Sequence, residues 1–262
     1  MTEPARTSIV MAVDNTQLNR FRAGTLARGP HQDRVDRLLR RLVRVGLRLL
    51  DWRVDATGLD RLPHDRGFLL VGAPHRAWVD PFLVIAAWPS SAPRLTWFGD
   101  GQTMIRSWWR RLLLPRLGMI PIDRRAGGPR AYADVVTSLI VRGGVVALFA
   151  EKGPPSSPTE TRAISPGFAY LAMAAGAPVV PVAIAGTHHI VRGSSFCVDV
   201  LPPLDPGPRV GDPFGPDGRD RARATAATFR AAVTDVLATR TPWVDARRPA
   251  RDRWPWLARL FR

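Results

Sequence analysis

The chain has 262 residues, of which 45% are hydrophobic, so it is long enough for one large α/β domain with a small appendage. Its formal net charge of +16 indicates an anionic partner, either membrane lipid or nucleic acid. The single cysteine, Cys197, excludes an internal disulfide and any metal site that is built from several cysteines.

The N-terminal region lacks the features of an exported or membrane-spanning protein. Residues 1–20 have no apolar core of the length that a signal peptide needs. No window of about 18 apolar residues exists anywhere in the chain, so we expect no transmembrane helix. We therefore expect a cytoplasmic protein that lies peripherally on the inner face of the cell membrane.

After a loose arm at residues 1–30, residues 34–50 form a predicted basic amphipathic helix. Leucine and valine recur at helical spacing on one side of this helix, and arginines recur on another. Two interpretations stay open: the helix packs on the core with a solvated arginine face, or it lies in a membrane interface. The arginines that define the basic face are Arg34, Arg37, Arg41, Arg44 and Arg48.

Strands and helices alternate through the rest of the chain. The strands are continuous runs of Val, Ile and Leu, which are typical of strands that are buried on both faces. We therefore predict an α/β fold with a mainly parallel central sheet covered by helices. The predicted strands are residues 67–72, 94–98, 119–122, 145–149, 179–184 and 195–201, and the predicted helices are residues 80–87, 103–117, 129–141, 167–176 and 219–238.

A histidine and an aspartate, His75 and Asp80, lie five residues apart after the strand at residues 67–72. On one helix or one strand this offset separates the two side chains, so they can pair only if the chain bends. Pro74 supplies the bend, and Asp80 followed by Pro81 has the pattern of a helix N-cap and first turn. Either His75 is a base that Asp80 orients, or Asp80 only caps its helix and His75 is an ordinary loop residue.

Four segments in order resemble the conserved blocks of the glycerolipid acyltransferase superfamily, the family of bacterial 1-acylglycerol-3-phosphate acyltransferases. They are PHRAWVDP at residues 74–81, GMIPIDR at 118–124, LFAEKG at 148–153 and APVVPVAI at 177–184. The third block is usually FPEGTR in the family, so Ala150 stands where proline is usual and no arginine follows directly. The resemblance covers about residues 55 to 205.

The resemblance implies roles for the residues that match the blocks. His75 would be the general base, with Asp80 fixing its tautomer. Arg124 would hold the phosphate of the acceptor, with Glu151, Lys152 and Gly153 beside it. Either Lys152 or Arg162 would replace the missing arginine of the third block, and Arg76 is a further candidate for binding substrate.

We divide the chain into a membrane-contacting arm and helix at residues 1–53, an acyltransferase domain at 54–240 and a basic aromatic tail at 241–262.

The expected function is transfer of a fatty acyl group from acyl-CoA, or from acyl-carrier protein, to the hydroxyl of a lysophospholipid such as 1-acylglycerol-3-phosphate. We expect no cofactor and no metal, because His188 and His189 are adjacent and lack partners at ligand spacing. A different lyso-lipid or glycolipid acceptor is an alternative, as is a basic protein without catalysis that binds membranes or nucleic acid. No nucleic-acid-binding motif is present, so the expected partners are the membrane surface, acyl-CoA and the lyso-lipid.

Overall fold

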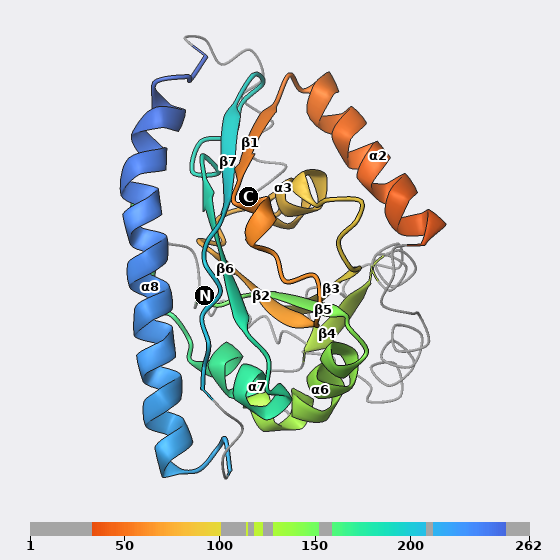
Figure 1. The fold of residues 1–262 in the computed structure, drawn as a ribbon. Helices are drawn as coiled ribbons and strands as arrows, with labels where there is room; N and C mark the ends of the chain where they lie inside the picture. Colours follow the sequence, from red (N-terminus) through yellow and green to blue (C-terminus); the bar gives the residue numbers. More distant parts are fainter. Residues whose placement is uncertain are drawn as a thin grey trace, which may run out of the picture.

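The computed structural model describes residues 33–100, 114, 118–122, 128–151, 159–207 and 212–249. Within these residues the fold is built on a seven-stranded sheet with the order β1-β7-β6-β2-β5-β3-β4 (Figure 1). Neighbouring strands are parallel except for β6 and β7, which are antiparallel. The strands are β1 Arg53–Thr57, β2 Phe68–Ala73, β3 Leu95–Asp100, β4 Met119–Ile122, β5 Val145–Phe149, β6 Val179–Ala185 and β7 Ser195–Val200.

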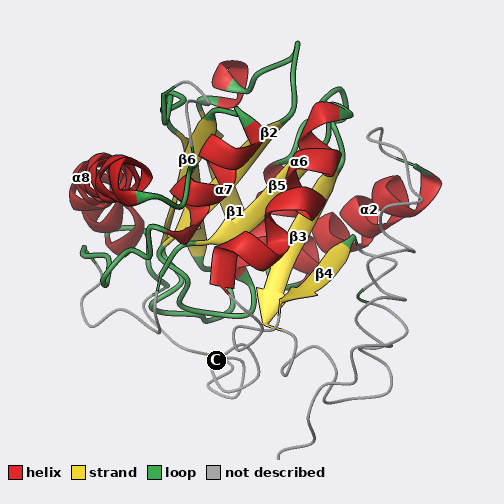
Figure 2. Ribbon diagram, turned by 90° about the horizontal axis from the view of Figure 1, so that it is seen from below, coloured by secondary structure: helices red, strands yellow, loops and turns green. Residues whose placement is uncertain are grey.

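The helices lie on both faces of the sheet, which confirms the predicted α/β class (Figures 1 and 2). Successive residues of β2 point to opposite faces, as the pleat requires. Leu69 and Val71 pack with α6, α7 and α8, whereas Phe68 and Leu70 pack with α2 and α3. The helices are α2 Arg34–Leu49, α3 Asp80–Ala87, α6 Ala133–Val141, α7 Gly167–Ala175 and α8 Pro216–Asp245, with short 3₁₀ turns at Leu59–Arg61 and Gly128–Tyr132.

The observed bounds of α3, β4 and β5 are the predicted ones, and the other described elements differ from prediction at their ends. Helix α8 runs to Asp245, so it enters the segment at residues 241–262 that we expected to be a tail. Strand β1 was not predicted, because its sequence RVDAT mixes charged and apolar residues, as an edge strand does. The predicted helix at residues 103–117 lies almost entirely outside the described residues.

Helix α2 has three faces rather than the two that its sequence predicts. Leu47 is buried in the core that α2 shares with α3. Arg44 borders this inward side, and its Nε donates to the carbonyl of Ala86 at 3.0 Å. Arg44 is nevertheless exposed, so it remains on the arginine face while one of its donors satisfies a carbonyl at the end of α3. A second apolar stripe remains 38% to 69% exposed and consists of Val35, Leu38, Leu42, Val45 and Leu49.

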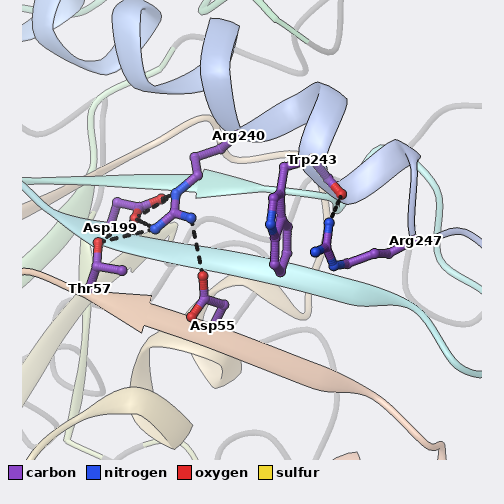
Figure 3. A network of polar contacts seen from close by, with 6 residues as sticks. All are labelled: Asp55, Thr57, Asp199, Arg240, Trp243 and Arg247. Carbon is purple, nitrogen blue, oxygen red and sulfur yellow. Dashed lines mark hydrogen bonds and ion pairs between the residues drawn. The ribbon is translucent and has the colours of Figure 1, made fainter.

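Helix α8 is fastened to the edge of the sheet by Arg240 (Figure 3). The guanidinium of Arg240 binds both carboxylate oxygens of Asp199 on β7 and one oxygen of Asp55 on β1. It also donates to the hydroxyl of Thr57 at 3.3 Å. This network joins α8 to β1, the last helix and the first strand among the described residues. None of the described helices is both long and apolar enough to cross a bilayer.

Candidate active site

The carboxyl ends of β2, β5 and β6 lie side by side at one edge of the sheet, because these three strands are adjacent and parallel. Ligands of open α/β sheets bind at this edge. The chain leaves β2 through a cis peptide bond between Ala73 and Pro74, and His75 follows at once. Glu151 follows β5 and His188 follows β6, so the topology brings all three to the same edge.

His75 and Asp80 form a pair, which is one of the two interpretations that their spacing left open. The Nδ1 atom of His75 lies 3.0 Å from Oδ2 of Asp80. The same oxygen accepts the backbone N–H groups of Arg76 at 2.7 Å and Ala77 at 2.8 Å. Asp80 is fully buried, whereas the side chain of His75 is 45% exposed. In a neutral imidazole, donation from Nδ1 of His75 to this carboxylate would leave the lone pair on Nε2.

The expected capping role of Asp80 is wrong. Val79 is the N-cap of α3, and Asp80 is the first helical residue. The chain turns at residues 77–80, where the N–H of Asp80 donates to the carbonyl of Ala77 at 3.1 Å. This turn points the carboxylate back toward His75 and the N–H groups that precede the helix. The side chain of Asp80 therefore organises the histidine loop rather than the first turn of α3.

Aromatic rings support the imidazole, and sequence reasoning did not predict this contact. The ring of Phe149 stacks on the ring of His75, with centroids 4.2 Å apart and an interplanar angle of 15°. Trp97 stacks behind Phe149 at 5.5 Å. The space for Phe149 exists because residue 72 is glycine: a Cβ atom there would lie 2.7 Å from the phenyl ring. These contacts hold the imidazole at a fixed distance from the end of β5.

Glu151 is buried between two segments. Its Oε2 atom accepts the backbone N–H of His75 at 3.1 Å, and its Oε1 atom accepts the backbone N–H of Arg162 at 2.9 Å. Burial raises the pKa of the Glu151 carboxyl above its ordinary value, while these two hydrogen bonds oppose the shift. The sequence placed Glu151 in the site but could not identify these partners.

Two of the predicted basic site residues, Arg76 and Arg162, lie among the described residues. Arg76 is partly buried, and its guanidinium donates to the main-chain carbonyl of Glu160 at 3.1 Å. Burial lowers the pKa of Arg76 below its ordinary value. Arg162 is exposed and reaches Glu151 through its backbone. The other three predicted residues, Arg124, Lys152 and Gly153, lie outside the described residues.

A mainly apolar pocket of about 260 Å³ lies beside the pair. Phe149 separates it from His75, since one ring both lines the pocket and stacks on the imidazole. Glu151 and Ser165 are the polar lining residues at this end. The apolar lining comes from β3, β4, β5, α7 and the turn before α6, and it includes Phe98, Ile122, Tyr132, Leu148, Phe168 and Leu171.

A second His–Asp pair lies at the same edge. The Nε2 atom of His188 is 3.0 Å from Oδ1 of Asp245, near the end of α8. Arg248 also reaches this carboxylate, at 3.2 Å. Burial lowers the pKa of His188, and the Asp245 carboxylate opposes that shift. Across the described residues, no three His, Cys, Asp or Glu side chains gather in a way that could hold a metal ion.

Comparisons with known proteins place this geometry in context. The sequence model of a family described as Acyltransferase matches residues 53–185. The crystal structure of the 1-acyl-sn-glycerophosphate (LPA) acyltransferase PlsC from Thermotoga maritima is similar, with a TM-score of 0.56 and 16% sequence identity. The alignment covers 86% of this chain and 88% of that chain, and at this identity it shows a shared fold. A search of curated proteins found no match.

Proposed function

Because the chain belongs to the acyltransferase family, we propose that it transfers a fatty acyl group from acyl-CoA or acyl-carrier protein to the hydroxyl of a lysophospholipid. A lysophospholipid such as 1-acylglycerol-3-phosphate is the default acceptor, and a different lyso-lipid or a glycolipid is the alternative. The observation that carries the proposal is the His75–Asp80 pair, with 3.0 Å between Nδ1 and Oδ2, on a half-exposed imidazole.

In this mechanism His75 is the general base. Asp80 fixes the tautomer that leaves Nε2 unprotonated, and Nε2 takes the proton of the acceptor hydroxyl as its oxygen attacks the thioester carbonyl. The imidazolium that forms is stabilised by the buried carboxylate of Asp80. The proton then passes to the leaving thiolate, which departs as a thiol. The hydroxyl attacks directly, so no nucleophilic side chain takes part in the transfer.

The apolar pocket supports a substrate with a hydrocarbon chain. Its lining carries few polar groups, and it ends beside the ring that stacks on His75. An acyl chain in this pocket would leave water, and each buried methylene stabilises the complex by roughly 0.8 kcal/mol. The polar end of the pocket, at Glu151 and Ser165, is where the carbonyl end of such a chain would lie.

Arginine would hold the anionic headgroup of the acceptor. Arg76, in the histidine loop, and Arg124, by its match to the second block, are the proposed ligands, since a guanidinium binds phosphate through two parallel hydrogen bonds. Lys152 and Gly153 remain candidates by position. Replacing Arg124 with Ala is expected to raise the acceptor KM far more than the donor KM. Equal changes in both constants would exclude a headgroup role.

A peripheral position on the inner face of the cell membrane is part of this proposal. The exposed stripe of α2 (Val35, Leu38, Leu42, Val45 and Leu49) is apolar, and exposed arginines run beside it at positions 34, 37, 41 and 48. A helix with such a stripe and such a border suits the interface of an anionic bilayer. The net charge of +16 has the matching sign.

The test is turnover with labelled acyl-CoA and a panel of lyso-lipids, with products identified by mass spectrometry. We expect one lyso-lipid class to gain the labelled acyl chain, and we expect no product with His75→Ala. An enzyme that acylates none of the panel from either acyl-CoA or acyl-carrier protein would refute the proposal. Vesicle binding against DNA binding at matched salt then separates the two non-enzymatic alternatives.

A further inference from the structure

The main chain at His75 is held by a carboxylate from another strand. Glu151 is only 7% exposed, and each of its two oxygens accepts one backbone N–H, from His75 and from Arg162. The segment that contains Arg162 is itself joined to the end of β5. The N–H of Ser165 donates to the carbonyl of Ala150 at 2.9 Å, and Glu151 forms a bridge with Ile164. Glu151 thus joins two loops that are far apart in the sequence.

Binding of an anionic headgroup does not suit this carboxylate. Both oxygens already accept hydrogen bonds from backbone donors, and a carboxylate offers no donor to a phosphate. A phosphate that touched Glu151 would meet a like charge in a buried place, which costs free energy. The geometry therefore differs from the substrate-binding role that the resemblance implies for this position.

We propose that Glu151 is a positioning residue that fixes the backbone of His75 against the segment at residues 159–165. The inference rests on the proposed function, because it concerns the same base. The imidazole has to stay on the ring of Phe149 at 4.2 Å and within 3.0 Å of Asp80 while its Nε2 faces the acceptor. A shift of about 1 Å in a catalytic group can cost on the order of 100-fold in rate.

Glu151→Gln is the informative variant because it preserves shape and removes one acceptor. An amide has one acceptor oxygen and one NH₂ group, so either His75 or Arg162 would present its N–H to another donor. We expect kcat to fall at least tenfold, with the donor KM and the acceptor KM both within twofold of wild type. Glu160→Gln is the matched control, since its side chain is exposed and its contact with Arg76 uses the main-chain carbonyl.

A second measurement needs no turnover. Amide hydrogen exchange at His75 and Arg162, read by NMR on the folded proteins without substrate, should be at least tenfold faster in Glu151→Gln at one or both amides. Glu160→Gln should exchange like wild type at both positions. If wild type acylates no lyso-lipid while Glu151→Gln still loses protection, the proposed function fails and the positioning contact stands.

Two results would overturn the inference. One is a Glu151→Gln enzyme with wild-type kcat and a raised acceptor KM, because a substrate ligand gives that pattern. The other is unchanged exchange at both amides in Glu151→Gln, because the carboxylate would then not hold the two segments. Circular dichroism at the assay temperature verifies that each variant is folded.

Discussion

The guanidinium of Arg44 in α2 donates to the main-chain carbonyl of Ala86 at 3.0 Å, near the end of the helix that carries Asp80. Arg40 donates in the same way to the carbonyl of Trp88, at 3.0 Å. Two arginines of α2 therefore satisfy carbonyls at the C-terminus of α3, where a positive charge is also favourable for the helix dipole. Helix α2 is therefore packed against α3, the helix that begins at Asp80, rather than attached loosely to the domain.

Replacing His75 with Ala should abolish acyl transfer without unfolding the protein. The side chain is half-exposed, so little packing is lost, whereas a general base accounts for about 10² to 10⁴ in rate. The measurement is kcat with a labelled acyl donor, together with a thermal melt. Loss of a general base should lower the rate at least about 100-fold. Activity above roughly a tenth of wild type would therefore contradict the assignment. Asp80→Asn should also lose activity, since the amide carries no charge to stabilise an imidazolium.

The exposed stripe of α2 should hold the protein on anionic vesicles. Changing Leu38, Leu42 and Leu49 together to Ser should weaken binding at least ~100-fold, because burying each leucine is worth about 1.5–3 kcal/mol. Thermal stability should not fall, since all three are exposed. The measurement is sedimentation with anionic and neutral vesicles. Val141→Ser is the control, because Val141 is 74% exposed on α6, across the sheet from α2.

The arginines beside that stripe should give the binding its salt dependence. Changing Arg37 and Arg41 to Gln should reduce the loss of vesicle binding as salt rises, since surface charges are screened beyond about 10 Å at 0.1 M. Arg44 is left unchanged in this variant because it caps α3. Equal salt dependence in the variant and wild type would show that these arginines do not face the bilayer.

Arg240→Ala should destabilise the fold strongly. The side chain of Asp199 is only 7% exposed, so the variant leaves a nearly buried carboxylate without its guanidinium. Loss of one partner of a buried pair costs about 3–5 kcal/mol, and we expect the lower end because Arg240 is a fifth exposed. Urea unfolding measures this loss. Adding Asp199→Asn to Arg240→Ala should recover part of the lost stability. A double variant no more stable than Arg240→Ala would show that the unpaired charge of Asp199 is not the cause of the loss.

Stability should fall with acid in a way that depends on His188. Burial lowers the pKa of His188 in the folded state, against the carboxylate of Asp245, and Arg248 and Arg76 add to the lowering. As pH falls through about 6.5, His188 therefore binds a proton in the unfolded chain before it does so in the folded protein. The free energy of unfolding thus keeps its full His188 contribution above pH 6.5 and loses it as pH falls below that value. The Tm of wild type should drop more between pH 8 and pH 5 than the Tm of His188→Gln. Parallel curves would exclude His188 as the cause.

The sequence by itself determined most of the described elements and singled out His75 and Asp80. Continuous Val, Ile and Leu runs predicted most of the buried strands, and the predicted bounds of α3, β4 and β5 agree with the observed ones. The five-residue spacing of His75 and Asp80, with Pro74 between strand and helix, showed that the two can pair if the chain bends, and the structure shows that they do. These features are local, since they depend on backbone geometry within a few residues.

The tertiary structure decided what surrounds the pair. Glu151 reaches the backbone of His75 across 76 positions of sequence, and the ring of Phe149 covers the imidazole because Gly72 leaves room for it. The two apolar sides of α2 look alike in sequence, and packing on α3 and the neighbouring core selects which of them is buried. These outcomes depend on strand order and on which helix covers which face, and hydrophobic periodicity does not encode either one.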